Sequence, residues 1–183
     1  MRRYLYLSLF VAVSLFAIAG VAAATGPHPA TQDVSASFTA DQVRSHSRTC
    51  TQGGNTFRIT NAVWRGTSTS TEPRLAGTLV ISSRTVLNET TGDGWMSGTW
   101  RTTPASQMKP GKGGRPRSNA RLSAVIDNGN HLDGLATGQV RVQWARLLGN
   151  WSATIVGNTL SGELGANVPA VPDNSALLYR GGC

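Results

Sequence analysis

The stretch RLSAVIDNGNHLDGLATGQVRVQW, residues 121–144, decides the fold class. Apolar and polar side chains alternate on both sides of Asn128-Gly129, so each flanking segment has one apolar and one polar face. The Asn-Gly pair tolerates the positive φ angles of a type I′ turn, which joins two antiparallel strands. The stretch therefore predicts a β-hairpin.

The hairpin strands show this period of two over 122–126 and 132–144, and the same period recurs elsewhere in the chain, in segments 57–63, 75–82 and 151–155. Turn signals at 91–94 and at Gly157-Asn158 separate these segments. No segment shows a long 3.6-residue period. We predict an all-β fold, a single antiparallel β-barrel of about seven to eight strands that is calycin-like by architecture only. A two-layer β-sandwich is the alternative.

Glycine recurs inside the predicted strands, in a bulky-x-Gly-x pattern at Gly77, Gly98, Gly134 and Gly162. Glycine weakens a strand, so its recurrence needs a physical cause. Sharp coiling at barrel corners, or close approach of neighbouring backbones, would supply one. The pattern therefore favours the barrel over the sandwich.

The N-terminus has the features of a secretory signal peptide. Arg2 and Arg3 precede an apolar run over residues 5–19, and small alanines follow at residues 22–24. We predict a signal peptide over 1–24, with an uncleaved membrane anchor as the alternative. The mature protein is then expected outside the cytoplasm, with no transmembrane segment after cleavage.

Length and composition limit the number of domains. The chain has 183 residues, of which 39% are apolar, enough for one packed domain. We predict a linker or N-terminal extension over 25–45 and a single barrel domain over 46–183. Capping-box spacing in Thr39-Ala40-Asp41-Gln42 predicts one short helical turn inside the extension.

The formal net charge is +8, and part of it is concentrated in a predicted long loop over 104–119. The loop holds Lys109, Lys112, Arg115 and Arg117 and no acidic residue. We interpret these four side chains as contacts for an anionic envelope polymer, with a simply solvated loop as the alternative. Residues 112–117 resemble an AT-hook, but Gly113 replaces its first core arginine, so no specific nucleic-acid partner is expected.

The two cysteines, Cys50 and Cys183, are predicted to form a disulfide that joins the start of the strands to the end of the chain. Cys50 is expected to lie just before the first strand. A free Cys183, or a bond between two chains, is the alternative.

Candidate catalytic residues are few. His131 and Asp133 are two residues apart on a predicted strand and therefore share one face, as an acid–base pair would require. Glu163 is the next candidate. A satisfied pair at the surface is the plainer interpretation of His131 and Asp133. We predict no metal site and no cofactor, and no Gly-x-Ser-x-Gly turn is present.

Trp95 and Trp100 are the candidate ligand-binding residues. They are five residues apart and therefore face opposite sides of one strand. One of them is then expected outside the core or in a lumen, where an indole stacks on a sugar or an apolar ligand.

Together these features predict a secreted, non-enzymatic β-barrel protein that binds a small apolar or amphipathic ligand or a cell-envelope component. One alternative is a barrel enzyme of the isomerase or cyclase type, with polar groups that converge inside the barrel. Another is a structural or adhesion-type envelope protein that uses the basic loop. Fold alone does not choose among them.

Overall fold

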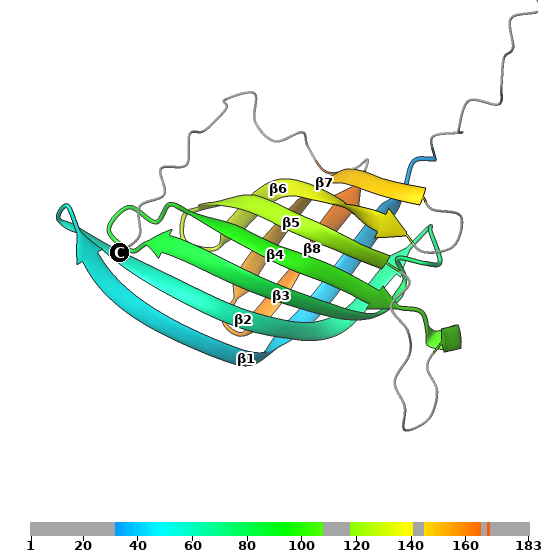
Figure 1. Cartoon of the computed structure of the whole chain (residues 1–183), viewed down its shortest axis with the longest axis horizontal. Coiled ribbons are helices and arrows are strands. Elements are labelled where there is room, and N and C mark those ends of the chain that lie inside the picture. Colours follow the sequence, from blue (N-terminus) through cyan, green and yellow to red (C-terminus); the bar gives the residue numbers. More distant parts are fainter. Residues whose placement is uncertain (1–31, 108–117, 141–144, 166–167, 169–183) are drawn as a thin grey trace, which may run out of the picture. The chain divides into compact units, whose positions relative to one another are not determined.

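The computed structural model describes residues 32–107, 118–140, 145–165 and 168 (Figure 1). Every element below lies within the unit Asp33–Cys183. The described residues form eight strands and one 3-10 helix. The elements are β1 (Ser35–Gln52), β2 (Asn55–Ser70), β3 (Gly77–Asn88), β4 (Gly94–Thr103), η1 (Ala105–Gln107), β5 (Ser118–Asp127), β6 (His131–Val140), β7 (Ala145–Val156) and β8 (Thr159–Gly165).

The strands form a closed antiparallel barrel in sequence order, and β8 pairs with β1 to close it. The closing ladder runs from Ser35 opposite Gly165 to Asp41 opposite Thr159. Closure pairs both edges of the sheet, which would otherwise present free backbone groups. The predicted all-β barrel is confirmed, and the sandwich alternative is wrong.

The barrel is strongly staggered. A row of directly paired residues can be followed around the barrel from Arg146 in β7. It crosses β6, β5, β4, β3, β2, β1 and β8 in turn, and it returns to β7 at Val156, ten residues further along the strand. Such a stagger tilts the strands, and with eight strands it leaves an interior that side chains can fill. The interior is filled in this way.

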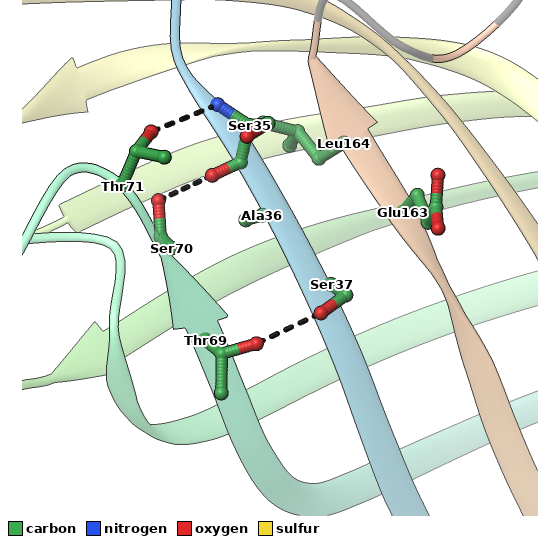
Figure 2. A pocket seen from close by; sticks show the side chains of 8 residues that line it. All are labelled: Ser35, Ala36, Ser37, Thr69, Ser70, Thr71, Glu163 and Leu164. Atoms are coloured by element: carbon green, nitrogen blue, oxygen red, sulfur yellow. Dashed lines mark hydrogen bonds between the residues drawn. The ribbon is translucent and has the colours of Figure 1, made fainter.

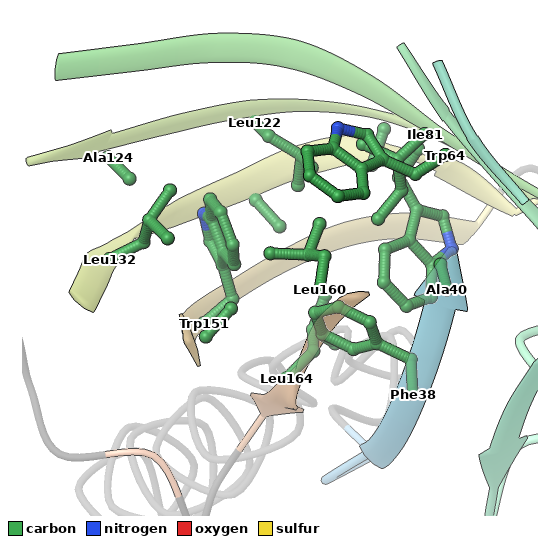
Figure 3. Close-up of a cluster of buried hydrophobic side chains, with 14 of the residues drawn as sticks. Phe38, Ala40, Trp64, Ile81, Leu122, Ala124, Leu132, Trp151, Leu160 and Leu164 are labelled. Carbon is green, nitrogen blue, oxygen red and sulfur yellow. The ribbon is translucent and has the colours of Figure 1, made fainter. Parts of the chain in front are cut away.

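The inward faces of the strands carry large apolar side chains (Figure 3). Trp100, Trp151, Leu79, Ile81 and Leu132 are each at most 1% exposed. They pack in one cluster to which every strand contributes. Burial of this apolar surface is the main force that stabilises the barrel.

Two of the recurrent glycines show why the strands need them. A Cβ on Gly134 in β6 would overlap the backbone carbonyl oxygen of Ser123 in β5. A Cβ on Gly162 in β8 would overlap the carbonyl oxygen of Ser152 in β7. Close approach of neighbouring backbones, one of the two predicted causes, is therefore confirmed at these positions.

The hairpin turns follow the sequence signals. Asn128 and Gly129 between β5 and β6 have φ angles of 52° and 78°, as a type I′ turn requires. Gly92 and Gly157 also have positive φ angles, at the β3–β4 and β7–β8 turns.

The predicted linker over 25–45 is wrong from Ser35 onward, because β1 begins there. Ala36, Phe38 and Ala40 are buried while the residues between them are exposed, which is the period of a strand. The predicted helical turn over 39–42 is wrong for the same reason. Cys50 lies inside β1 rather than before the first strand.

The predicted basic loop over 104–119 is shorter than expected, because β5 already begins at Ser118. Its basic residues Lys109, Lys112, Arg115 and Arg117 lie outside the described residues, as do the predicted signal peptide and Cys183. The Cys50–Cys183 bond therefore stays a prediction. Among the described residues, no helix has the length and apolar character needed to cross a membrane.

Candidate functional site

Trp100 belongs to the packed interior. It is 1% exposed, and its ring meets that of Phe38 edge to face, with centroids 5.0 Å apart and planes at 89°. Such a T-shaped contact is a favourable arrangement of two aromatic rings in a core. The predicted opposite orientation of Trp95 and Trp100 is confirmed, and of these two candidate ligand-binding residues Trp95 is the one that lies outside the core.

In the described part of the chain, two further tryptophans, Trp64 and Trp151, are buried in the interior and held in place by hydrogen bonds. Trp64 donates its Nε1–H to Ser83 Oγ at 3.0 Å, and Trp151 donates to the carbonyl oxygen of Ser123 at 3.3 Å. These hydrogen bonds satisfy the polar atoms of side chains that are otherwise in apolar contact. A ligand inside the barrel would have to displace them.

The loop between β2 and β3 packs against the interior cluster. Leu75 of this loop is 1% exposed and joins the interior cluster. Glu72 and Arg74 fix the loop through a two-pronged ion pair, and Thr102 Oγ1 donates to the carbonyl oxygen of Arg74 at 2.9 Å. The hydrogen bonds from Arg74 hold the pKa of the Glu72 carboxyl below its ordinary value, against the opposing effect of burial.

Trp95 lies on the outer wall, which is the side of the strands that faces away from the interior. A hollow of about 300 Å³ opens there across β4, β5 and β6. Its outward-facing residues are Trp95, Ser97, Ser123, Val125, Asp133 and Leu135. We call this the Trp95 hollow.

Strand register explains how the Trp95 hollow forms. Trp95 is directly opposite Val125, and Val125 is directly opposite Asp133. On the other side of Trp95, β3 places the buried Val86 in the same row. An apolar strip therefore runs across the outer wall and ends at a carboxylate.

The carboxylate of Asp133 is paired. His131 Nε2 lies 3.0 Å from Asp133 Oδ2, with the two side chains 45% and 34% exposed. The predicted shared face of these residues is confirmed. Their exposure fits the surface-pair interpretation better than that of a buried acid–base pair. Two separate expectations, a ligand-binding Trp95 and a polar His131–Asp133 pair, thus meet at one place.

Glu163 lies apart from that place. Asp133 is opposite Ser152, and Ser152 is opposite Glu163, so two strand spacings of about 4.8 Å each separate the acids. Glu163 lines a second hollow of about 430 Å³, together with Ser35, Ser37 and Thr69 (Figure 2).

Several hydroxyl groups of this second hollow are hydrogen-bonded within it, to one another or to the backbone. Ser37 Oγ and Thr69 Oγ1 are 2.8 Å apart, and Ser70 Oγ donates to the carbonyl oxygen of Ser35 at 2.6 Å. Glu163 is not hydrogen-bonded to them in Figure 2. The hollow therefore supplies a carboxylate and hydroxyls, but among the residues that the structure describes it brings no second acid or base beside Glu163.

The barrel interior offers little acid–base chemistry. Among the buried residues that the structure describes, Glu72 is the one with a charge, and Arg74 occupies both of its oxygens. Within the same described ranges, no group of three or more His, Cys, Asp or Glu side chains is arranged to hold a metal ion.

Val125 and Leu135 complete the Trp95 hollow, and neither was a predicted site residue. Both occupy positions of the period-two pattern where a polar side chain is expected. Apolar residues in the polar phase of two neighbouring strands are the signal that would have marked this surface.

Comparisons with known proteins identify no relative. No family model matches the sequence, and neither the curated proteins nor the solved structures contain a significant match.

Proposed function

We propose that the protein is an exported, non-enzymatic binding protein that holds an amphipathic ligand, or part of an envelope component, in the Trp95 hollow. One observation carries the proposal: an indole, two aliphatic side chains and a paired carboxylate line one open hollow on the outer wall. Export rests on the signal-peptide features of residues 1–24.

The chemistry of the hollow suits a ligand with an apolar and a polar side. Trp95, Val125 and Leu135 supply the apolar surface, and an indole also stacks on the apolar face of a sugar ring. Ser97 and Asp133 lie beside it and supply hydrogen-bonding groups. A few polar groups placed around an apolar surface are typical of small-molecule sites.

The size of the hollow limits the ligand. Its volume of about 300 Å³ is at the lower end of the range for ligand pockets. A single sugar ring or a short alkyl segment fits such a volume. Because the hollow is open to solvent, the rest of a larger envelope molecule can extend beyond it.

The alternatives have less support. A site for an isomerase or cyclase inside the barrel would need converging polar groups, whereas His131 and Asp133 lie on the outer wall and Glu163 lines a different hollow. A role in the envelope through Lys109, Lys112, Arg115 and Arg117 concerns residues outside the described part of the chain.

The experiment compares Trp95→Ala with a matched variant, Leu148→Ala, which removes an apolar side chain that is 75% exposed on β7. Calorimetric titration uses octyl glucoside below its micelle concentration and, separately, oligomers of N-acetylglucosamine. We expect binding of one of these probes to weaken by about tenfold or more in Trp95→Ala and to be unchanged in Leu148→Ala. Equal binding by the wild type and Trp95→Ala would overturn the proposal, as would a wild type that binds neither probe.

A further inference from the structure

Five exposed arginines on the outer wall of β1 to β5 form no ion pair with an acidic residue of the described part of the chain. They are Arg44, Arg65, Arg84, Arg101 and Arg121, and together we call them the arginine wall. The ion pairs among the described residues involve Arg58, Arg74 and His131 instead. The arginine wall thus keeps its guanidinium groups available to an external partner.

Strand register places these arginines close together. Arg44 and Arg121 share one row across the wall, through Val63, Ser82 and Thr99. Arg84 lies in the next row on one side, and Arg65 and Arg101 share the next row on the other. With strands about 4.8 Å apart and alternate residues about 6.8 Å apart, the Cα atoms of nearest wall arginines are roughly 8–12 Å apart.

Acidic residues are absent from the centre of this surface. Strands β2, β3 and β4, over residues 55–70, 77–88 and 94–103, contain no Asp or Glu. Asp41 in β1 is opposite Arg65, but its Oδ1 accepts a hydrogen bond from Thr159 Oγ1 at 2.8 Å. The separation of charge is therefore a property of this wall, since the described residues as a whole contain nearly equal numbers of basic and acidic side chains.

A hollow of about 460 Å³ lies within the arginine wall. Arg44, His46 and Arg84 border it, and its other outward-facing polar groups include Asn61, Ser82 and Thr99. It therefore combines guanidinium groups with hydroxyl and amide groups in one depression. The hollow is the second observation that indicates a ligand, after the clustering of the five arginines on one wall.

We propose that the arginine wall binds an anionic polysaccharide. Guanidinium groups recognise sulfate, phosphate and carboxylate groups through paired hydrogen bonds. Several arginines spread over a wall suit a chain with repeated anionic groups better than one small anion. The hydroxyl and amide groups of the hollow then bind the hydroxyls of the sugar units.

Two other polyanions fit less well. Among the described residues, His46 is the one aromatic side chain at the hollow and no Trp, Tyr or Phe lines it, whereas proteins that bind single-stranded nucleic acids stack successive bases on several aromatic rings. Attachment to a bilayer generally combines basic residues with an apolar surface that enters the headgroup region, and the described residues of this hollow include only Ala62 and Val63 as apolar side chains. The five arginines are not part of the Trp95 hollow, although the hollow within the wall shares Ser97 with it. The two proposals are tested separately because their variants change different residues.

The experiment measures binding of the full chain to heparin and to polygalacturonate, which carry sulfate and carboxylate groups respectively. The test variant is Arg44→Ser/Arg84→Ser/Arg121→Ser. The matched variant, Arg48→Ser/Arg58→Ser/Arg146→Ser, removes the same charge from three exposed arginines outside the wall. At 150 mM salt we expect the test variant to bind at least about tenfold more weakly than the wild type, and the matched variant to lose less affinity. The affinity of the test variant should also depend less steeply on salt concentration than that of the wild type.

Three results would overturn the proposal. Equal losses in the two triple variants would show that only net charge matters. Equal or tighter binding to single-stranded DNA or to vesicles of anionic phospholipid would assign the wall to another partner. Full binding by the test variant, with loss when Lys109, Lys112, Arg115 and Arg117 are changed to serine, would assign the contact to those residues. Trp95→Ala should bind heparin as the wild type does, which separates this test from that of the proposed function.

Discussion

The guanidinium of Arg74 donates two hydrogen bonds to the carboxylate of Glu72: Nε lies 2.7 Å from Oε1, and Nη2 lies 2.7 Å from Oε2. The backbone N–H of Arg74 also donates to Oε1, at 3.0 Å. These bonds hold the loop that packs Leu75 into the interior cluster. Although Glu72 and Arg74 are only two residues apart in sequence, their ion pair fixes the β2–β3 loop, and we call it the Glu72–Arg74 clamp.

Removing the charge from this clamp should destabilise the barrel. Glu72→Gln keeps the size of the side chain but cannot accept both guanidinium hydrogen bonds, so we expect a loss of about 1–3 kcal/mol in the free energy of unfolding. Urea denaturation measures it. Glu163→Gln, which neutralises an exposed acid, is the control and should change stability by less than about 0.5 kcal/mol. Equal effects would show that the clamp adds nothing.

The clamp should also give stability a dependence on acid pH. The pKa of Glu72 is lower in the folded protein than its ordinary value of 4.5. At pH values between the folded-state and unfolded-state pKa, the folded state therefore binds fewer protons than the unfolded state. The contribution of the ionised Glu72 to stability is full at pH values above its unfolded-state pKa, and it is lost as the pH falls through its folded-state pKa. The stability gap between wild type and Glu72→Gln should therefore be constant above about pH 5 and shrink below pH 4.5. A gap that stays constant down to pH 3 would contradict this.

Alanine should not be tolerated where two backbones meet. A Cβ on Gly134 would overlap backbone atoms of β5, so Gly134→Ala should cost at least about 1–3 kcal/mol, as overpacked cores do. Gly149→Ala is the matched variant, because the nearest atom to its added Cβ would be 3.7 Å away. Thermal unfolding should show a clear drop in Tm for the first variant and little change for the second. Similar Tm values in both would mean that β5 and β6 can separate at no cost.

Much of this fold follows from local sequence, because a period of two and an Asn-Gly turn act over neighbouring residues. The start of β1 was missed since small and polar residues, such as Ala36 and Ser37, give a weak alternation there. Register around a closed barrel is different. It depends on all eight ladders together, and a shift of one residue turns every side chain to the other face.

The candidate site shows the same division. Sequence spacing placed His131 beside Asp133 and put Trp95 on the face opposite Trp100, as both pairs lie on single strands. Sequence spacing could not predict that Trp95 lies near Asp133, because the two residues are on different strands and are related only through the register of β5 with β4 and β6. The arginine wall was missed for the same reason, because its members come from five different strands.

The two tryptophans of β4 should respond oppositely to truncation. Trp100 is 1% exposed and contacts Phe38, so Trp100→Ala should cost about 3–5 kcal/mol in the free energy of unfolding. Trp95 is only partly buried on the outer wall, so Trp95→Ala should cost less than about 2 kcal/mol. Urea denaturation of both variants under one set of conditions gives the comparison. A larger loss for Trp95 would mean that its ring is mainly structural.

Asp133 provides the sharpest separation of binding from stability. Its contact with His131 is partly exposed, and such pairs contribute about 0.2–1 kcal/mol, so Asp133→Asn should leave the urea midpoint almost unchanged. The same variant removes a charged acceptor from the edge of the Trp95 hollow, and hydrogen bonds to charged groups are the stronger ones. Binding of whichever probe the wild type takes up should therefore weaken several-fold in calorimetric titration. Glu163→Gln removes an acid two strands away and should bind as the wild type does. If Asp133→Asn lost more than about 2 kcal/mol of stability, the pair would be part of the structure of the barrel.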